Sequence, residues 1–277
     1  MSASPAAPPS ADPGPSALAP PDPWHTLGRF TPARIGLGRA GGSLPTRPAL
    51  AFQLAHARAR DAVQRALDTD ALRRDLARLG PAVLEARSAA PDRAGFIARP
   101  DLGRALAPAS AAALAAVPPP PAPFDAALVV ADGLSARAAE RHAAPLLAAL
   151  LPRLDRAGWR LAPLVIVTQG RVAVADEIGA ALGARMAVIL LGERPGLSSP
   201  DSLGAYLTWA PRRGRTNAER NCISNIREPD GLGYAAAAHK LFHLMHEARR
   251  RGLSGVDLKE DAPALDPPPA ARLDGAQ

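Results

Sequence analysis

The second half of the chain alternates short apolar runs with longer amphipathic stretches. The pattern indicates strand, helix, strand, helix, strand at residues 126–131, 136–157, 164–168, 174–182 and 186–191. The two amphipathic stretches stop at Gly158 and Gly183, and glycine accepts the left-handed backbone that often ends a helix. Continuous apolar runs are typical of parallel strands buried on both faces. Alternation of this kind predicts an α/β fold with a parallel sheet.

Further elements extend this sheet. Residues 206–210 and 222–226 are candidate strands, and residues 234–251 form a final amphipathic helix closed by Gly252. The fold class predicted is a Rossmann-like, doubly wound parallel sheet domain preceded by a smaller helical N-terminal domain. Ligands of such sheets bind where the strands' carboxyl ends lead into loops. The candidate loops are 132–135, 169–172 and 192–197, together with the polar segment 221–225 if it borders the same edge.

Prolines divide the chain. Of its 31 prolines, eight fall in residues 1–23, five in 118–123 and four in 261–277. Because proline removes a backbone donor and disfavours helix before it, these segments predict two disordered tails and a stiff linker. The domains expected between them are a helical, partner-docking unit at 24–117 and the sheet domain at 124–260. In the first, Thr46 begins one helix and residues 70–79 form another.

Composition narrows the class of protein. The 33 basic and 26 acidic residues give a net charge of +7, but arginines alternate with acids and no basic arm occurs, so a nucleic-acid partner is not expected. Cys222 is the single cysteine, which excludes an intrachain disulfide and a CxxC metal site. No apolar run reaches the 18 to 20 or so residues of a membrane span, and no secretory signal pattern opens the chain. We expect a cytoplasmic protein.

Residues 36–41, GLGRAG, match the GxGxxG dinucleotide fingerprint in letters only. The preceding residues make a poor strand, and Pro45 and Pro48 interrupt the place of the helix that should follow. We therefore interpret this segment as a surface loop that docks on another chain.

Two other constellations have structural interpretations. His239, His243 and His246 share one face of the last predicted helix, but no further zinc ligand accompanies them, so a solvated or interfacial row is favoured. Asp132 and Ser135 lack the GxSxG elbow of a hydrolase, and Ser135 is favoured as a helix cap.

The loop at 192–202, GERPGLSSPDS, directly follows the most hydrophobic predicted strand. A charged pair, a rigid turn and several hydroxyls in this position suit a ligand site. The alternative is a polar loop held by a network between Glu193 and Arg194.

Long motifs in the chain resemble the small subunit of ethanolamine ammonia-lyase. The resemblance extends over most of residues 28–260 and is carried by RFTPARIGLGRAGGSLPTRPALAFQLAHARARDAV, ARPDLGR, VVADGLS, QGRV, LLGERPGLSSPDSLGAYLTWAPR, ERNCISNIR and SGVDLK. It implies an adenosylcobalamin-dependent enzyme that converts ethanolamine to acetaldehyde and ammonia by a radical mechanism. Substrate and radical would be held by a separate large subunit, so no catalytic residue and no metal ligand is expected here.

The resemblance places cobalamin contacts on Val172, Glu193 and Cys222, all within the candidate loops above. A carboxylate accepts hydrogen bonds from the amide arms of a corrin, while valine and cysteine pack against the ring. The DxHxxG signature of base-off binding is absent, so the cofactor should keep its own dimethylbenzimidazole on cobalt. The alternative is a free-standing Rossmann-like protein that binds a nucleotide or another small molecule.

Some members of this family carry an amphipathic N-terminal segment associated with packaging into a bacterial microcompartment. Residues 1–23 are interrupted by proline here, so they are not expected to form such a helix.

Overall fold

The computed structural model describes residues 22–31, 33–119 and 121–263. The chain divides into two compact units after Arg58. Almost all of residues 1–23 and most of 261–277 lie outside the described ranges, so the disordered tails, and with them the N-terminal segment discussed for packaging, stay predictions.

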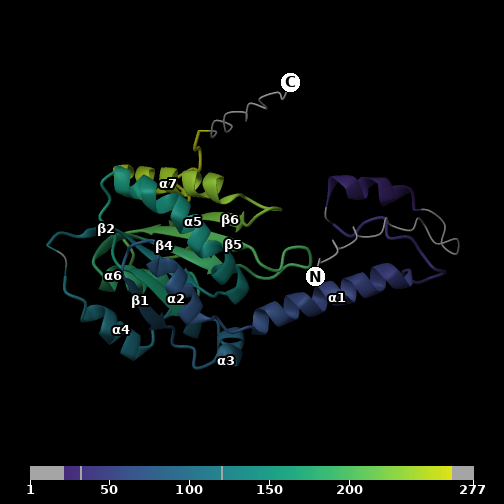
Figure 1. Cartoon of the computed structure of the whole chain (residues 1–277), viewed down its shortest axis with the longest axis horizontal. Coiled ribbons are helices and arrows are strands. Elements are labelled where there is room, and N and C mark those ends of the chain that lie inside the picture. The colour runs from purple at the N-terminus through teal and green to yellow at the C-terminus, as the bar shows by residue number, and fades with distance from the viewer. Residues whose placement is uncertain (1–21, 32, 120, 264–277) are drawn as a thin grey trace, which may run out of the picture. The chain divides into compact units, whose positions relative to one another are not determined.

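The larger unit is an α/β structure built on one six-stranded sheet (Figure 1). Helix α1 (Thr46–Gln64) begins in the smaller unit and ends in the larger one. The elements that follow are α2 (Thr69–Ala77), β1 (Val83–Arg87), α3 (Arg93–Ala98), η2 (Leu102–Arg104), α4 (Pro108–Ala115), β2 (Phe124–Ala131), α5 (Ala136–Arg156), β3 (Leu164–Thr168), α6 (Val174–Ala181), β4 (Ala184–Gly192), β5 (Leu203–Trp209), η3 (Asn217–Glu219), β6 (Arg220–Ile226) and α7 (Tyr234–Arg251). The strand order is β1-β3-β2-β4-β5-β6.

Helices cover both faces of the sheet. On one face, buried leucines and alanines of α2, α5 and α7 pack against the sheet in one core cluster. On the other, α4 and α6 pack against β2, β3 and β4 in a second cluster. Figure 1 shows α5 and α7 together on one side and α4 and α6 on the other. The continuous apolar runs of β2, β3 and β4 follow from this burial on both faces.

Local signals place the helix ends as predicted. Ser135 caps α5, its side chain accepting a hydrogen bond from the Ala138 amide. Gly252 ends α7 in the left-handed conformation at φ 68°. In the described ranges, no helix combines the length and the apolar character that a membrane span requires.

The predicted parallel sheet is wrong in one respect, because the sheet is mixed. Strands β1, β3, β2 and β4 are parallel, whereas β5 pairs antiparallel with both β4 and β6. A parallel crossover needs a dozen or more residues, usually with a helix. The connections at 193–202 and 210–219 are shorter and contain only the 3-10 turn η3, so the chain reverses direction at each.

The predicted helical N-terminal domain, residues 24–117, contains strand β1. It is an edge strand that pairs only with β3 and carries Glu85 and Arg87, so it lacks the apolar run that marks a central strand. Elements α2 to α4 belong to the same unit as the sheet. The structure therefore divides after Arg58, and not at the proline-rich segment 118–123.

The smaller unit carries the GxGxxG segment. Gly36, Gly38 and Gly41 all have positive φ, and a Cβ on Gly36 would lie 2.5 Å from the backbone nitrogen of His25. No strand occurs among the described residues of this unit, so the segment lacks the strand that a dinucleotide site needs.

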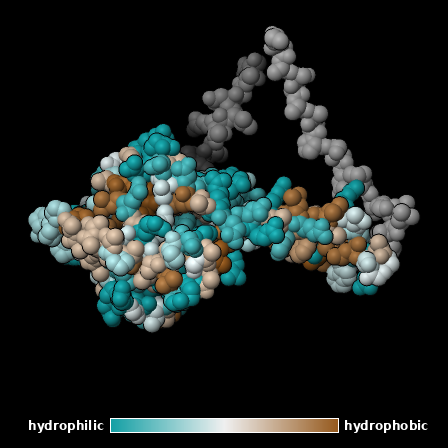
Figure 2. All heavy atoms as spheres, turned by 90° about the horizontal axis from the view of Figure 1, so that it is seen from below, coloured by the Kyte–Doolittle hydropathy of each residue, from teal (hydrophilic) through white to brown (hydrophobic). Residues whose placement is uncertain are grey.

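Large apolar side chains are exposed on the same unit, and Figure 2 shows hydrophobic surface there in brown. The exposed residues are Trp24, Leu27, Phe30, Ile35, Leu44, Leu50, Phe52 and Leu54.

Candidate functional site

The loop after β4 begins with a close backbone approach that only glycine permits. A Cβ on Gly192 would lie 2.0 Å from the carbonyl oxygen of Ser135 and 2.4 Å from that of Asp132. The Glu193 amide then donates to the Ser202 carbonyl oxygen at 3.0 Å, which closes the base of the loop. These contacts fix the point at which the Glu193 side chain leaves the sheet.

The Glu193 carboxylate lies over the paired ends of β5 and β6. The Ser224 hydroxyl donates to its Oε1, and the Asn225 amide donates to its Oε2 at 3.2 Å. Asn225 has φ 57°, a left-handed conformation at the end of the strand. A Cβ on Gly204 would lie 2.9 Å from Oε1, so glycine leaves room for the carboxylate. Glu193 is therefore held by Ser224 and Asn225 of β6, and not by the alternative network with Arg194 considered from the sequence.

Cys222 lies on the same sheet face, beside Tyr206. The two residues are paired in register between β5 and β6. Desolvation raises the pKa of the Cys222 thiol, a hydrogen bond with the Tyr206 side chain opposes this by lowering it, and the Glu193 carboxylate adds a smaller rise. Burial, followed by Cys222 itself, raises the pKa of the Tyr206 phenol. Both groups are therefore neutral at physiological pH, and thiol, phenol and the Glu193 carboxylate form one continuous cluster.

Val172 lies in the turn between β3 and α6. The preceding Arg171 amide donates to the Gly103 carbonyl oxygen at 2.7 Å, and the Ala175 amide donates to the Val172 carbonyl oxygen at 3.3 Å. The half-buried Val172 side chain packs on the core cluster that Tyr206 also borders. The structure thus brings Glu193 and Cys222 together and places Val172 on the same side of the sheet.

A buried ion pair between Arg220, the first residue of β6, and Asp176 of α6 lies next to this face. Arg220, two residues before Cys222, donates to both oxygens of Asp176 at 2.7 Å, to the Thr208 hydroxyl at 2.7 Å and to the Arg215 carbonyl oxygen at 2.9 Å. The side chains of Arg220 and Asp176 are 4% and 2% exposed. The pair ties α6 to β5 and β6, and so fixes the turn with Val172 relative to Cys222.

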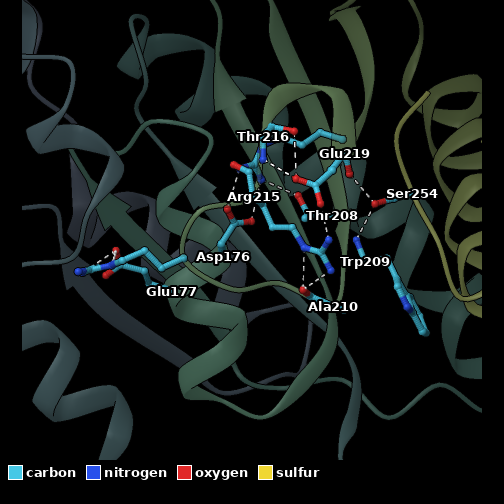
Figure 3. Close-up of polar contacts among 11 residues, drawn as sticks. Asp176, Glu177, Thr208, Trp209, Ala210, Arg215, Thr216, Glu219 and Ser254 are labelled. Carbon is cyan, nitrogen blue, oxygen red and sulfur yellow. Dashed lines mark hydrogen bonds and ion pairs between the residues drawn. The ribbon is translucent and has the colours of Figure 1, made fainter. Parts of the chain in front are cut away.

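The connection from β5 to β6 is held by a second polar network (Figure 3). The Glu219 carboxylate accepts hydrogen bonds from the Arg215 guanidinium and the Thr216 backbone amide. The hydrogen bond from the Thr216 amide contributes most to lowering the pKa of Glu219 to about 2. The Trp209 amide donates to the Ser254 hydroxyl at 2.8 Å, and that hydroxyl donates to the Glu219 carbonyl oxygen at 2.6 Å. These hydrogen bonds hold a connection whose only helical element is the 3-10 turn η3.

Asp132 directly follows the carboxyl end of β2, and its side chain is buried. Burial raises its pKa to about 6, opposed by the Arg93 guanidinium, whose Nη1 lies 3.2 Å from Oδ2. The Gly170 amide donates to Oδ1 at 3.2 Å. Because Ser135 caps α5, Asp132 and Ser135 form no nucleophile–base pair, and the role predicted for Ser135 is confirmed.

The histidine row has other partners. The ring of His239 is hydrogen-bonded to the Pro263 carbonyl oxygen at 2.8 Å, that of His243 to Asp261 at 3.0 Å, and His246 stacks on Phe242. Within the described ranges, no three His, Cys, Asp or Glu side chains gather as a metal site.

Sequence reasoning missed Tyr206 and the specific role of Ser224. Ser224 lay in a polar segment already singled out, but Tyr206 is an ordinary strand residue in the sequence. Only the register between β5 and β6 places it against Cys222.

Comparison with known proteins identifies the family. The family model described as ethanolamine ammonia-lyase light chain (EutC) matches residues 21–259. The ethanolamine ammonia-lyase small subunit of Ralstonia nicotianae is 62% identical over 242 residues, which cover 87% of this chain and 89% of the relative. The small subunit of Azotobacter vinelandii is 60% identical over 256 residues, which cover 92% of each chain. That of Pseudomonas aeruginosa is 57% identical over 242 residues, which cover 87% of this chain and 88% of the relative. The chain belongs to the ethanolamine ammonia-lyase light-chain family.

Proposed function

We propose that this chain is the small subunit of an adenosylcobalamin-dependent ethanolamine ammonia-lyase, active only in complex with a large subunit. The observation that carries the proposal is the family match over residues 21–259, which includes every residue of the site. Adenosylcobalamin would supply the radical chemistry that turns ethanolamine into acetaldehyde and ammonia. This chain would supply one wall of the cofactor site.

The residues on the exposed face of β5 and β6 fit the rim of a corrin. A carboxylate has about four acceptor positions, and two of those on Glu193 are used by Ser224 and Asn225. The remaining positions can accept from the amide arms of the corrin. Val172, and the neutral thiol of Cys222, offer an uncharged surface for the ring itself. These residues would bind and orient the cofactor, with dimethylbenzimidazole as the lower ligand of cobalt.

The exposed apolar residues of the smaller unit support docking to a large subunit. Eight large hydrophobic side chains between Trp24 and Leu54 are exposed, and Phe30 is 72% exposed. Apolar side chains grouped in this way mark an interaction surface. We propose that the large subunit binds this surface and the neighbouring glycine loop.

The test is co-expression with a large subunit of the same family. We expect the two chains to purify as one complex that deaminates ethanolamine when adenosylcobalamin is added. The isolated chain should show no turnover, because the proposal assigns substrate and radical to the large subunit. Turnover by this chain alone, or a complex that forms but never deaminates ethanolamine, would contradict the proposal.

A further inference from the structure

Arginines gather around Phe96 at the carboxyl edge of the parallel strands. The guanidinium of Arg171 lies 4.2 Å from the centre of the Phe96 ring, and that of Arg93 lies 4.8 Å from it. Arg171 also packs so closely on Gly103 that a Cβ there would lie 2.7 Å from its Cγ. Arg104 follows Gly103 in the chain, and its positive charge acts on the Arg171 guanidinium, so it is a third arginine near the group.

The sheet register brings Arg194 to the same edge. Val167 of β3 and Leu191 of β4 both pair with Ala131 of β2. Arg171 follows Val167 by four residues and Arg194 follows Leu191 by three, so the two arginines leave the sheet on either side of β2. The strands that precede them are therefore about 10 Å apart, twice the strand spacing.

Carboxylates compensate little of this charge. Arg93 pairs with Asp132, but the Nε of Arg171 is buried without a hydrogen-bond partner. Arg104 and Arg194 are exposed and have no ion pair to any of the residues that the structure describes. The Glu193 carboxylate is directed to β6. Burial and then repulsion by the surrounding arginines lower the pKa of Arg171, which agrees with an excess of positive charge here.

We propose that Arg104, Arg171 and Arg194 form an anion subsite that binds the phosphodiester of the cofactor's nucleotide tail. This inference rests on the proposed function. Arg171 precedes Val172 and Arg194 follows Glu193, so the subsite adjoins two of the proposed corrin contacts. The corrin arms are neutral amides, and the phosphodiester is the anionic group of the molecule. Guanidinium groups match phosphate oxygens in geometry as well as in charge.

The test measures cofactor affinity in the assembled complex and does not depend on turnover. Two ligands are titrated into the complex: cyanocobalamin, and dicyanocobinamide, which lacks the nucleotide tail and its phosphate. The proteins are the wild-type complex and the complexes with Arg104→Gln, Arg194→Gln and both changes together. Binding is followed by equilibrium dialysis. Both arginines are exposed and have no ion pair within the described ranges, so their loss should leave the fold intact. Arg74→Gln is the matched control, because Arg74 is an exposed arginine of α2, which packs on the opposite face of the sheet.

We expect each single variant to bind cyanocobalamin about three- to tenfold more weakly, and the double variant more weakly still. Dicyanocobinamide affinity should not change in any variant, and Arg74→Gln should match the wild type for both ligands. Equal weakening of both ligands, unchanged cyanocobalamin binding, or loss of the complex itself would each overturn the phosphate assignment. A wild-type complex that binds no cobalamin would instead refute the proposed function.

Discussion

Glu193 gives the most direct test of the cofactor face. Its carboxylate leaves the sheet at Gly192, where no larger residue fits, and is oriented by Ser224 and Asn225. Glu193→Ala removes these internal hydrogen bonds together with any accepted from the corrin arms. Glu193→Gln keeps the shape and one acceptor oxygen, but its amide nitrogen is a donor, so one of the two hydrogen bonds from Ser224 and Asn225 is lost.

The size of the effect follows from the hydrogen bonds that are lost. Leaving amide donors of the corrin unpaired in a partly buried site costs about 1 to 3 kcal/mol, or roughly five- to a hundredfold in affinity. We expect Glu193→Ala to show this full loss and Glu193→Gln a smaller one. Ser224→Ala should weaken cofactor binding by less than Glu193→Ala, because it frees the carboxylate without removing it.

The assay is the adenosylcobalamin concentration that gives half-maximal activity of the complex, with thermal unfolding of each variant beside it. Turnover at saturating cofactor should change little, because the proposed function assigns the reacting groups to the large subunit. Glu85→Ala is a matched control, since Glu85 lies in β1 at the opposite edge of the sheet. Unchanged cofactor affinity in Glu193→Ala, or outright unfolding of the subunit, would show that Glu193 only holds the loop.

Three further predictions concern docking and stability. Gly36→Ala should weaken assembly with the large subunit while leaving cofactor contacts on the sheet domain unchanged, because a Cβ at φ 60° would clash with His25; pull-down with the large subunit measures this. Arg220→Met should destabilise the chain by about 3 to 5 kcal/mol in urea unfolding, because it leaves Asp176 buried without its cation, and Asp176→Leu added to it should recover part of the loss. Asp132 has a folded-state pKa of about 6 against an ordinary 3.8, so the folded chain binds more protons and its contribution to stability falls as pH rises from about 4 to 6. Between about pH 4 and 6 the free energy of unfolding should fall by on the order of 3 kcal/mol in the wild type and not in Asp132→Asn. If both proteins showed the same dependence of unfolding free energy on pH, the prediction would be wrong.

Local chemistry in the sequence determined most of the elements. Strand β3 occupies the predicted residues, and α7 has the predicted bounds and ends at Gly252. Ser135 caps α5 as expected, because capping depends on one side chain and an amide three residues away. Such features involve neighbours in the chain, and residue patterns record them directly.

Tertiary structure alone decided how the elements meet. The reversed direction of β5 relative to β4 and β6, the pairing of edge strand β1 with β3, and the division after Arg58 depend on contacts between distant segments. The site shows the same difference. The sequence singled out the segments of Glu193 and Cys222 as candidates near a sheet edge, but the partnership of Glu193 with Ser224 and of Cys222 with Tyr206 required the register of β5 against β6. Strand pairing is set by which faces become buried together, and that is a property of the packed sheet.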